Sequence, residues 1–200
     1  MKNSYAGLAA RVAAVAFAFA AAGAAAQGYP AKPVRFVVPY APGGSTDTLA
    51  RTLGVKLTDL LGQQVVVDNR PGANGNIGMD IVAHALPDGY TIVLGYIANL
   101  AIDPSLYPKM PYDPVRDFAP ITELASSPNV LVAHPSVPVK SFRELLAKAK
   151  QGQFNFASAG VGSVGHLTGE LLNQMAGTRM AHVPYKGSGQ AVTDLLGGHV

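Results

Sequence analysis

The chain has 200 residues, no cysteine, and a formal net charge of +3 from 15 basic and 12 acidic residues. The lack of cysteine excludes a disulfide framework, a thiolate metal site and a cysteine nucleophile. The sequence contains no basic run of the kind that binds nucleic acid, so nucleic acid is not expected as a partner. Charged residues make up only 14% of the chain, beside 22 glycines and 15 prolines, which favours buried strands joined by tight loops.

The first 26 residues have the pattern of a secretory signal peptide. Two basic residues precede an apolar run, and the alanines at positions 24–26 offer a small-residue cleavage site. The run is shorter than the roughly 20 residues that a membrane span needs. We therefore expect a periplasmic protein whose mature chain begins near Gln27. Removing the two basic residues of this segment leaves 13 basic residues against 12 acidic ones, so the mature chain is nearly neutral.

The segment that follows alternates strand and helix patterns. The expected elements are a buried strand at Val34–Val38, a helix at 46–61 ended by Gly62, a strand at 65–68, a helix capped by Asn76 and a strand at 90–95. This order predicts a parallel sheet with right-handed crossovers. We assign residues 27–120 to this first α/β lobe. Five prolines punctuate its last part, from about residue 97, and predict an ordered surface connection without regular structure.

Residues 121–200 repeat the α/β pattern after a crossover. The expected elements are extended segments at 121–125 and 130–133, a helix from the capping box Ser141–Glu144, a strand at 154–157, a helix at 163–176 ended by Gly177, a strand at 180–183 and a helix from Gly189. The last four residues look like a helix stop followed by the start of another strand. We therefore expect a second α/β lobe that is incomplete, as in a C-terminally truncated chain.

A glycine-rich loop, PYAPGGSTD at residues 39–47, joins the first strand to the first helix. Such a loop leaves backbone N–H groups converging at a helix N-terminus, where the dipole favours a carboxylate or phosphate. The alternative is a turn that uses glycine only for its dihedral freedom, and these residues alone leave both interpretations open. Asp47 would repel an anion there, so we expect it to hold the loop; the alternative is a contact with a cationic group of the ligand.

Two other motifs suggest competing functions. Residues 160–165 match the dinucleotide fingerprint G-x-G-x-x-G, but no acidic residue at the end of the next strand is available to hold a ribose. Ser163 and His166 share a helix face, so an exported α/β hydrolase that uses them is an alternative, although G-x-S-x-G does not occur. A helix cap is the simpler role for Ser163. His84, His134, His182 and His199 show no metal-ligand spacing, and neither a metal nor a cofactor is expected.

Five spaced motifs add up to a family pattern. They are PYAPGGSTD at 39–47, NRPGANGNIG at 69–78, PDGY at 87–90, SAGVGSVGHL at 158–167 and VPYKG at 183–187. Together they resemble the Bug-type periplasmic receptors, the solute-binding proteins of tripartite tricarboxylate transporters. Asn74 departs from the family, which usually has glycine there. The resemblance implies an α/β, two-lobed type II Venus-flytrap fold, and the family's chain continues well past position 200.

The resemblance also implies a function, a ligand class and a set of residues. It implies a non-enzymatic, monomeric receptor that captures a small carboxylate between its lobes and delivers it to membrane transporter subunits. Family ligands are di- and tricarboxylates, acidic amino acids and aromatic acids. A ligand sensor for a membrane kinase is a further alternative. The implied ligand-binding residues are Tyr40, Gly43, Gly44, Ser45, Thr46, Asp47, Ser158, Ala159, Gly160, Ser163, His166 and Tyr185.

Overall fold

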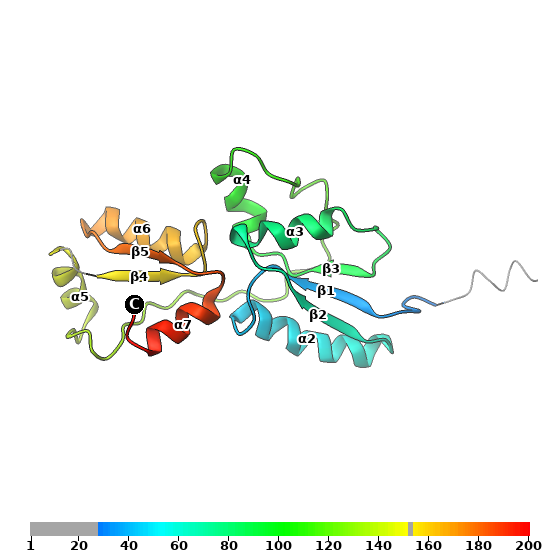
Figure 1. The fold of residues 1–200 in the computed structure, drawn as a ribbon, viewed down its shortest axis with the longest axis horizontal. Helices are drawn as coiled ribbons and strands as arrows, with labels where there is room; N and C mark the ends of the chain where they lie inside the picture. The colour runs from blue at the N-terminus through cyan, green and yellow to red at the C-terminus, as the bar shows by residue number, and fades with distance from the viewer. Residues whose placement is uncertain (1–27, 152–153) are drawn as a thin grey trace, which may run out of the picture.

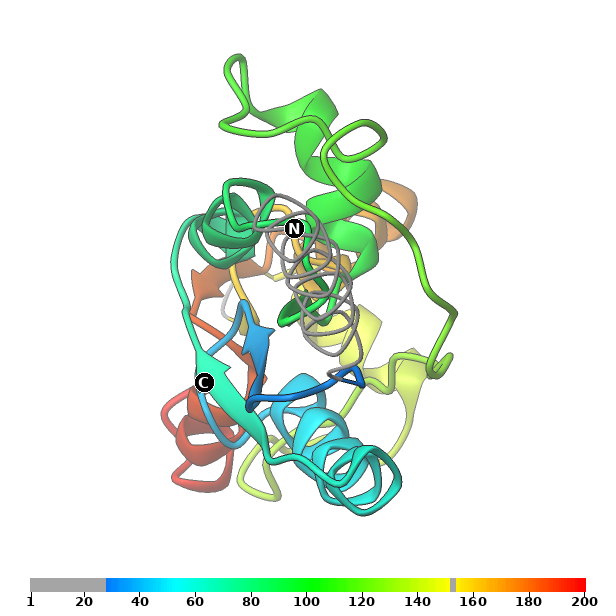
Figure 2. The ribbon, with the colours of Figure 1, turned by 90° about the vertical axis from the view of Figure 1, so that its right-hand side faces the viewer.

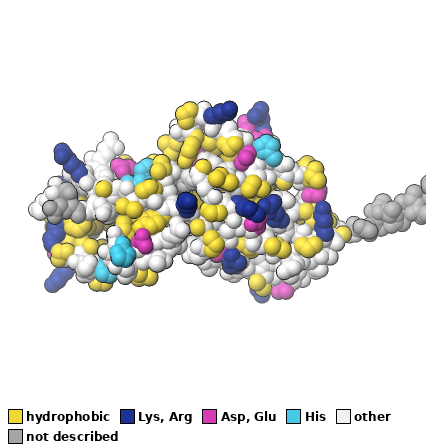
Figure 3. Space-filling view, viewed as in Figure 1, with side chains coloured by type: hydrophobic (Ala, Val, Ile, Leu, Met, Phe, Trp, Pro, Cys, Tyr) yellow, Lys and Arg dark blue, Asp and Glu magenta, His cyan; other side chains and the backbone are white. Residues whose placement is uncertain are grey.

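The computed structural model describes residues 28–151 and 154–200, which form two α/β lobes lying side by side (Figure 1). The predicted signal peptide lies outside the described residues. Within the ranges that are described, no helix is long and apolar enough to cross a membrane. Lys and Arg side chains are dispersed over the visible face of both lobes and are interspersed with Asp and Glu (Figure 3).

Lobe 1 is built on a three-stranded parallel sheet with the strand order β2-β1-β3. The strands are β1 (Val34–Val38), β2 (Val65–Asn69) and β3 (Thr91–Val93). In the register, Val34 pairs with Val65 on one side of β1, and Arg35 pairs with Thr91 on the other. Helices α2 (Ser45–Leu61) and α3 (Asn76–Ala83) cover opposite faces of this sheet (Figure 1).

The central strand β1 is apolar at four of its five positions because both of its faces are covered, and the exception, Arg35, pairs with Asp68 of β2. The β1 residues Val34, Phe36 and Val38 are buried in one core cluster with Ala50 of α2, Val65 and Leu94. Leucines of α2 at positions 49, 53, 57 and 61 pack against this cluster. On the other face, Val37 and Met79 of α3 are fully buried. Helix α2 ends as predicted at Gly62, which adopts a left-handed conformation and donates its N–H to the carbonyl oxygen of Thr58.

Residues 98–106 differ from the surface connection that the prolines predict. They form a π-helical turn, η2 (Ala98–Ile102), that runs directly into helix α4 (Asp103–Leu106). Asn99 and Asp103 are fully buried. The hydroxyl of Tyr112 donates to the carbonyl oxygen of Asn99 at 2.7 Å. Polar side chains, rather than an apolar repeat, hold this turn, so hydrophobic periodicity gave no sign of it.

Lobe 2 has a two-stranded parallel sheet formed by β4 (Asn155–Ser158) and β5 (Ala181–Pro184). Its helices are α5 (Phe142–Ala149), α6 (Val164–Ala176) and α7 (Ser188–Leu196). Both predicted serine caps are present. Ser141 Oγ accepts the N–H of Glu144 at 3.2 Å, and Ser163 Oγ accepts the N–H of His166 at 3.3 Å.

The connection between the lobes runs along one side of the molecule (Figure 2). The sequence predicted extended segments at 121–125 and 130–133, but the structure, over its described residues, assigns neither to a strand. Ile121 and Val130 are 81% and 75% exposed. A β-rich composition favours extended backbone, but a strand also needs a hydrogen-bonding neighbour, and these segments have none in the described residues.

Candidate functional site

Loops at the carboxyl ends of the strands of both lobes meet at the junction between the lobes (Figure 1). The loop after β1 contacts the loop after β5: the N–H of Ala41 donates to the carbonyl oxygen of Lys186 at 3.1 Å. The loop after β2 lies against the loop after β4, since a Cβ placed on Gly162 would come within 3.0 Å of Asn74 Nδ2. In open α/β sheets, ligands bind at the carboxyl ends of the strands. The junction is therefore the candidate site.

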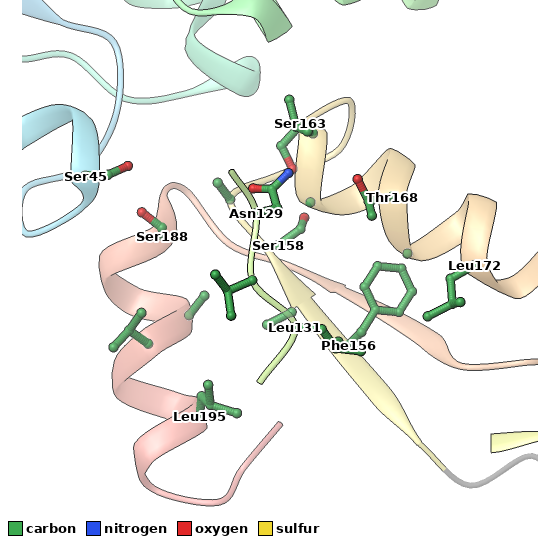
Figure 4. Close-up of a pocket in the computed structure, with 18 of the residues that line it drawn as sticks. Ser45, Asn129, Leu131, Phe156, Ser158, Ser163, Thr168, Leu172, Ser188 and Leu195 are labelled. Carbon is green, nitrogen blue, oxygen red and sulfur yellow. The ribbon is translucent and has the colours of Figure 1, made fainter. Parts of the chain in front are cut away.

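A cavity of about 540 Å³ lies at this junction and extends into lobe 2. Hydroxyl groups line the end that faces lobe 1, and Ser45 and Ser188 point toward one another across the junction (Figure 4). The end within lobe 2 is apolar and includes Phe156, Leu172 and Leu195. Among the described residues that line the cavity, none is charged at neutral pH.

Three helices begin at this cavity. Helix α2 begins at Ser45, α6 follows its cap Ser163, and α7 begins at Ser188; all three serines line the cavity. The N–H groups of a first helical turn have no partner within the helix, and the helix dipole places partial positive charge there. The hydroxyl-lined end of the cavity is therefore suited to an anion, although no Lys or Arg side chain lines it in the described residues.

Asp47 turns toward its own loop. Its Oδ2 accepts the N–H of Gly43 and Nε–H of Arg51, both at 3.0 Å, and its Oδ1 accepts from Asn69 Nδ2 at 3.0 Å. The residue is only 4% exposed. Burial alone would raise the pKa of Asp47, but the hydrogen bonds from Arg51, Gly43 and Asn69 outweigh it and hold the pKa below its ordinary value. This arrangement is the loop-holding role that the sequence favoured.

We expect Asp47→Asn to lower the free energy of unfolding by about 1–3 kcal/mol at neutral pH, because a buried, charge-assisted network loses its anion. A carboxylate with a depressed pKa contributes stability above its ordinary pKa and loses that contribution as the pH falls. The difference between parent and variant should therefore shrink toward pH 3, as measured by urea denaturation. Binding of a simple carboxylate should be preserved.

Asp88→Asn provides the control, since Asp88 lies in an exposed turn and contacts Lys32 at 3.5 Å. It should change the free energy of unfolding by no more than about 1 kcal/mol, as exposed ion pairs do. Equal stabilities of Asp47→Asn and Asp88→Asn at neutral pH would contradict the loop-holding role.

The predicted site residues divide into three groups. The large cavity is lined by Tyr40, Ser45, Thr46, Ser158, Ala159 and Ser163. A smaller cavity of about 270 Å³ is lined by Tyr40, Ala159, Gly160 and Tyr185. Gly43, Gly44, Asp47 and His166 are not in the lining of either cavity. Tyr185 directs its hydroxyl to Asp194 Oδ2 at 2.6 Å, within lobe 2.

Ser163 and His166 do not form a nucleophile–base pair. Ser163 Oγ accepts the backbone N–H of His166, and the Nδ1 of His166 accepts the N–H of Gly162 at 3.2 Å. The imidazole is therefore directed to the loop backbone rather than to the hydroxyl. This geometry gives no support to the hydrolase alternative, which needs a base within hydrogen-bonding reach of the serine oxygen. Among the described residues, no group of three potential metal ligands occurs.

The sequence pattern did not predict several residues of the large cavity. Some of them lie in recognisable sequence motifs and others do not. Ser188 lies in a second strand–glycine–helix loop, VPYKGSG, that echoes VPYAPGG in lobe 1 and was a usable signal. Phe156 and Leu172 lie in the strand at 154–157 and the helix at 163–176 that the sequence predicts, but no motif indicated that they line a cavity. Asn129 and Leu131 belong to the connection between the lobes, and nothing in the sequence pattern indicated that they reach the site.

Two α/β lobes that face one another across a cavity at their strand ends define a periplasmic binding protein. The family model "Tripartite tricarboxylate transporter family receptor" matches residues 49–200. The chain belongs to this family, as the five motifs predicted, and the predicted two-lobed fold is confirmed by the solved structures that it resembles.

Among its curated relatives, protein BugT of Bordetella pertussis is 46% identical over 189 residues, covering 93% of this chain and 58% of BugT. A solved structure described as a periplasmic transporter is 43% identical, with a TM-score of 0.84 over 86% of this chain and 59% of that one. An R. palustris protein solved with adipate is 39% identical, with a TM-score of 0.84 over 86% of this chain and 58% of that one. The chain thus spans little more than half the length of these relatives.

MatC from Rhodopseudomonas palustris, solved with bound malate, is a further structural relative. It is 36% identical to this chain, with a TM-score of 0.79, over 86% of this chain and 59% of MatC. Family membership and fold therefore rest on sequence and structure together.

Proposed function

We propose that this protein is an extracytoplasmic solute-binding receptor that captures a small carboxylate between its lobes and delivers it to membrane transporter subunits. One observation carries the proposal: the N-termini of α2, α6 and α7 converge on a hydroxyl-lined cavity whose described lining includes no acidic side chain. The relatives solved with adipate and with malate support the ligand class, because both ligands are small carboxylates. The predicted signal peptide supports action in the periplasm.

In the proposed complex, the ligand carboxylate lies between Ser45, Ser163 and Ser188. Hydroxyl groups and first-turn N–H groups of the three helices donate hydrogen bonds to its oxygens. The carbon skeleton extends toward the apolar part of the cavity, which includes Phe156 and Leu172. Backbone donors recognise a carboxylate without recognising what it is attached to, so the lining around the skeleton selects among carboxylic acids. No covalent step is involved, and the protein binds stoichiometrically.

The proposal is tested by isothermal titration calorimetry of the purified protein with succinate, adipate and benzoate. We expect saturable binding of at least one of these carboxylates with a stoichiometry of one. Absence of binding to every carboxylate tested, or continued turnover of an ester substrate by the protein, would count against a receptor of this class.

A pair of serine variants tests where the carboxylate lies. Ser163→Ala and Ser141→Ala each remove an N-cap of nearly the same geometry, so each should destabilise lobe 2 by about 1 kcal/mol. Ser163 lines the cavity, whereas Ser141 caps α5 and is exposed. Only Ser163→Ala should weaken carboxylate binding, by about 0.5–3 kcal/mol, the range for a neutral to charge-assisted hydrogen bond. Equal affinities of the two variants would place the carboxylate elsewhere.

A further inference from the structure

Two histidines stack on one another directly behind the loop that joins β4 to α6. The rings of His166 in α6 and His182 in β5 lie 4.1 Å apart, centroid to centroid, at an interplanar angle of 30°. The ring of His182 also stacks on Phe156 of β4, with centroids 5.0 Å apart. Neither imidazole is in the lining of the two cavities at the lobe junction. The pair therefore contacts the loop from outside the two cavity linings.

Each ring holds one end of that loop. At the end near β4, Ser158 Oγ lies 2.6 Å from His182 Nε2 and accepts the N–H of Gly160 at 3.1 Å. At the end near α6, the Nδ1 of His166 accepts the N–H of Gly162 at 3.2 Å. Gly162 is buried, and Ser158 and Ser163 are each at most 5% exposed. The two histidines thus fix the backbone between the two serines that line the cavity.

We propose that the His166–His182 pair positions the β4–α6 loop for ligand binding and that a proton gained by His166 releases the loop and lowers ligand affinity. The bond from Gly162 requires Nδ1 of His166 to be an acceptor, so the ring must be neutral with its proton on Nε2. An imidazolium carries N–H groups at both nitrogens and cannot accept. Protonation would leave two donors facing each other, with the buried N–H of Gly162 unpaired.

Two further features oppose a second positive charge in the pair. Stacked rings at this separation would place two cations in contact, and burial together with the charge of His166 lowers the pKa of His182. Two carboxylates lie nearby. Glu170 of α6 acts in the opposite sense and favours the protonated form of His182. Asp103 of α4 lies across the junction beside Gly162. In the described structure, neither carboxylate hydrogen-bonds to either imidazole.

The first test needs no ligand, so its outcome is separate from that of the proposed function. The amide resonance of Gly162 and the ring resonances of His166 are followed by NMR between about pH 8 and pH 5, where histidine changes charge. We expect the Gly162 amide to shift with the same midpoint as the His166 ring. In His166→Asn, whose Oδ1 accepts a hydrogen bond without titrating, the Gly162 amide should stay constant. A Gly162 amide that does not move in the parent, or that titrates equally in His166→Asn, would overturn the proposal.

The second test measures affinity for adipate over the same pH range; if adipate does not bind, succinate or benzoate replaces it. Loss of one neutral hydrogen bond corresponds to an affinity about three- to tenfold weaker at the acid end. His166→Asn should bind more tightly than His166→Ala at pH 8 and should lose the pH dependence. His84→Asn is the control, because His84 is exposed in lobe 1, and it should keep the parent's profile. A parent affinity that is constant or rises in acid would overturn the coupling, whereas failure of all carboxylates to bind refutes the proposed function instead.

Discussion

Gly44→Val is expected to abolish measurable carboxylate binding while both lobes stay folded. The backbone of Gly44 is extended (φ −86°, ψ 175°), so a side chain there causes no dihedral strain. The obstacle is the other lobe: a Cβ on Gly44 would lie 2.8 Å from Ser188 Oγ and 3.6 Å from Gly189 N. The two γ carbons of valine would force the N-terminus of α7 away from that of α2. Calorimetry measures the loss, and circular dichroism confirms folding.

Two milder variants distinguish a steric contact between the lobes from backbone strain within the β1–α2 loop. Gly44→Ala meets only the end of the Ser188 side chain, which can rotate, so binding should weaken without being lost. Gly43→Ala has nothing within 4 Å but requires a residue at φ 84°, so it strains the same loop without a contact between lobes. A folded Gly44→Val that binds as tightly as the parent would show that the β1–α2 loop is only a turn.

The strands and helices of lobe 1 were predictable because local pattern and global packing agree there. Val34–Val38 is apolar at every position except Arg35, which pairs with Asp68, and helices cover both faces of that strand. Four leucines of α2, Leu49, Leu53, Leu57 and Leu61, recur at helical spacing and pack against one face of the sheet, whereas Leu60 is 82% exposed. Gly62 and Gly177 end their helices in left-handed conformations that glycine adopts without strain.

The structure around Asn99 and Asp103 could not be predicted, because no local pattern encodes it. Both side chains are buried by residues distant in the sequence: Asn74 donates to Asp103 Oδ1 at 2.9 Å, and Tyr112 donates to the carbonyl of Asn99. Burial raises the pKa of Asp103, and the hydrogen bond from Asn74 only partly offsets it. Such contacts depend on three-dimensional proximity, which hydrophobic periodicity does not report.

The loops of the candidate site were visible in the sequence, but the directions of their side chains were not. Glycine motifs marked the loops after β1 and β4, and the structure brings both to the junction. Asp47 of α2 faces its own loop partly because Asn69, at the end of β2 and 22 residues away in the sequence, donates to its carboxylate. The sequence pattern singled out Asn74 only because the family usually has glycine at this position, and it predicted no contact for the asparagine side chain. Asn74 adopts the left-handed conformation (φ 55°, ψ 28°) that asparagine tolerates, and its side chain reaches Asp103.

Gly162→Ala is expected to keep the lobes from closing on one another and to weaken carboxylate binding at least about tenfold, which corresponds to roughly 1.4 kcal/mol. Gly162 has φ 86°, which strains any other residue by about 1–2 kcal/mol. A Cβ there would also lie 2.8 Å from Asp103 Oδ1 and 3.0 Å from Asn74 Nδ2, both in lobe 1. Asp103 is fully buried and cannot give way easily. Small-angle scattering should therefore show a larger radius of gyration.

Gly177→Ala isolates the strain from the contact between lobes. Gly177 is in the same lobe and has φ 65°, but nothing lies within 4 Å of a Cβ placed on it. Both variants should lower the free energy of unfolding by similar amounts, because alanine is strained in the left-handed conformation; urea denaturation measures this. Only Gly162→Ala should enlarge the molecule and weaken carboxylate binding, because only there does the new methyl group meet the other lobe. If the two variants match in scattering and in affinity, the contact of Gly162 with Asp103 and Asn74 is not needed for binding.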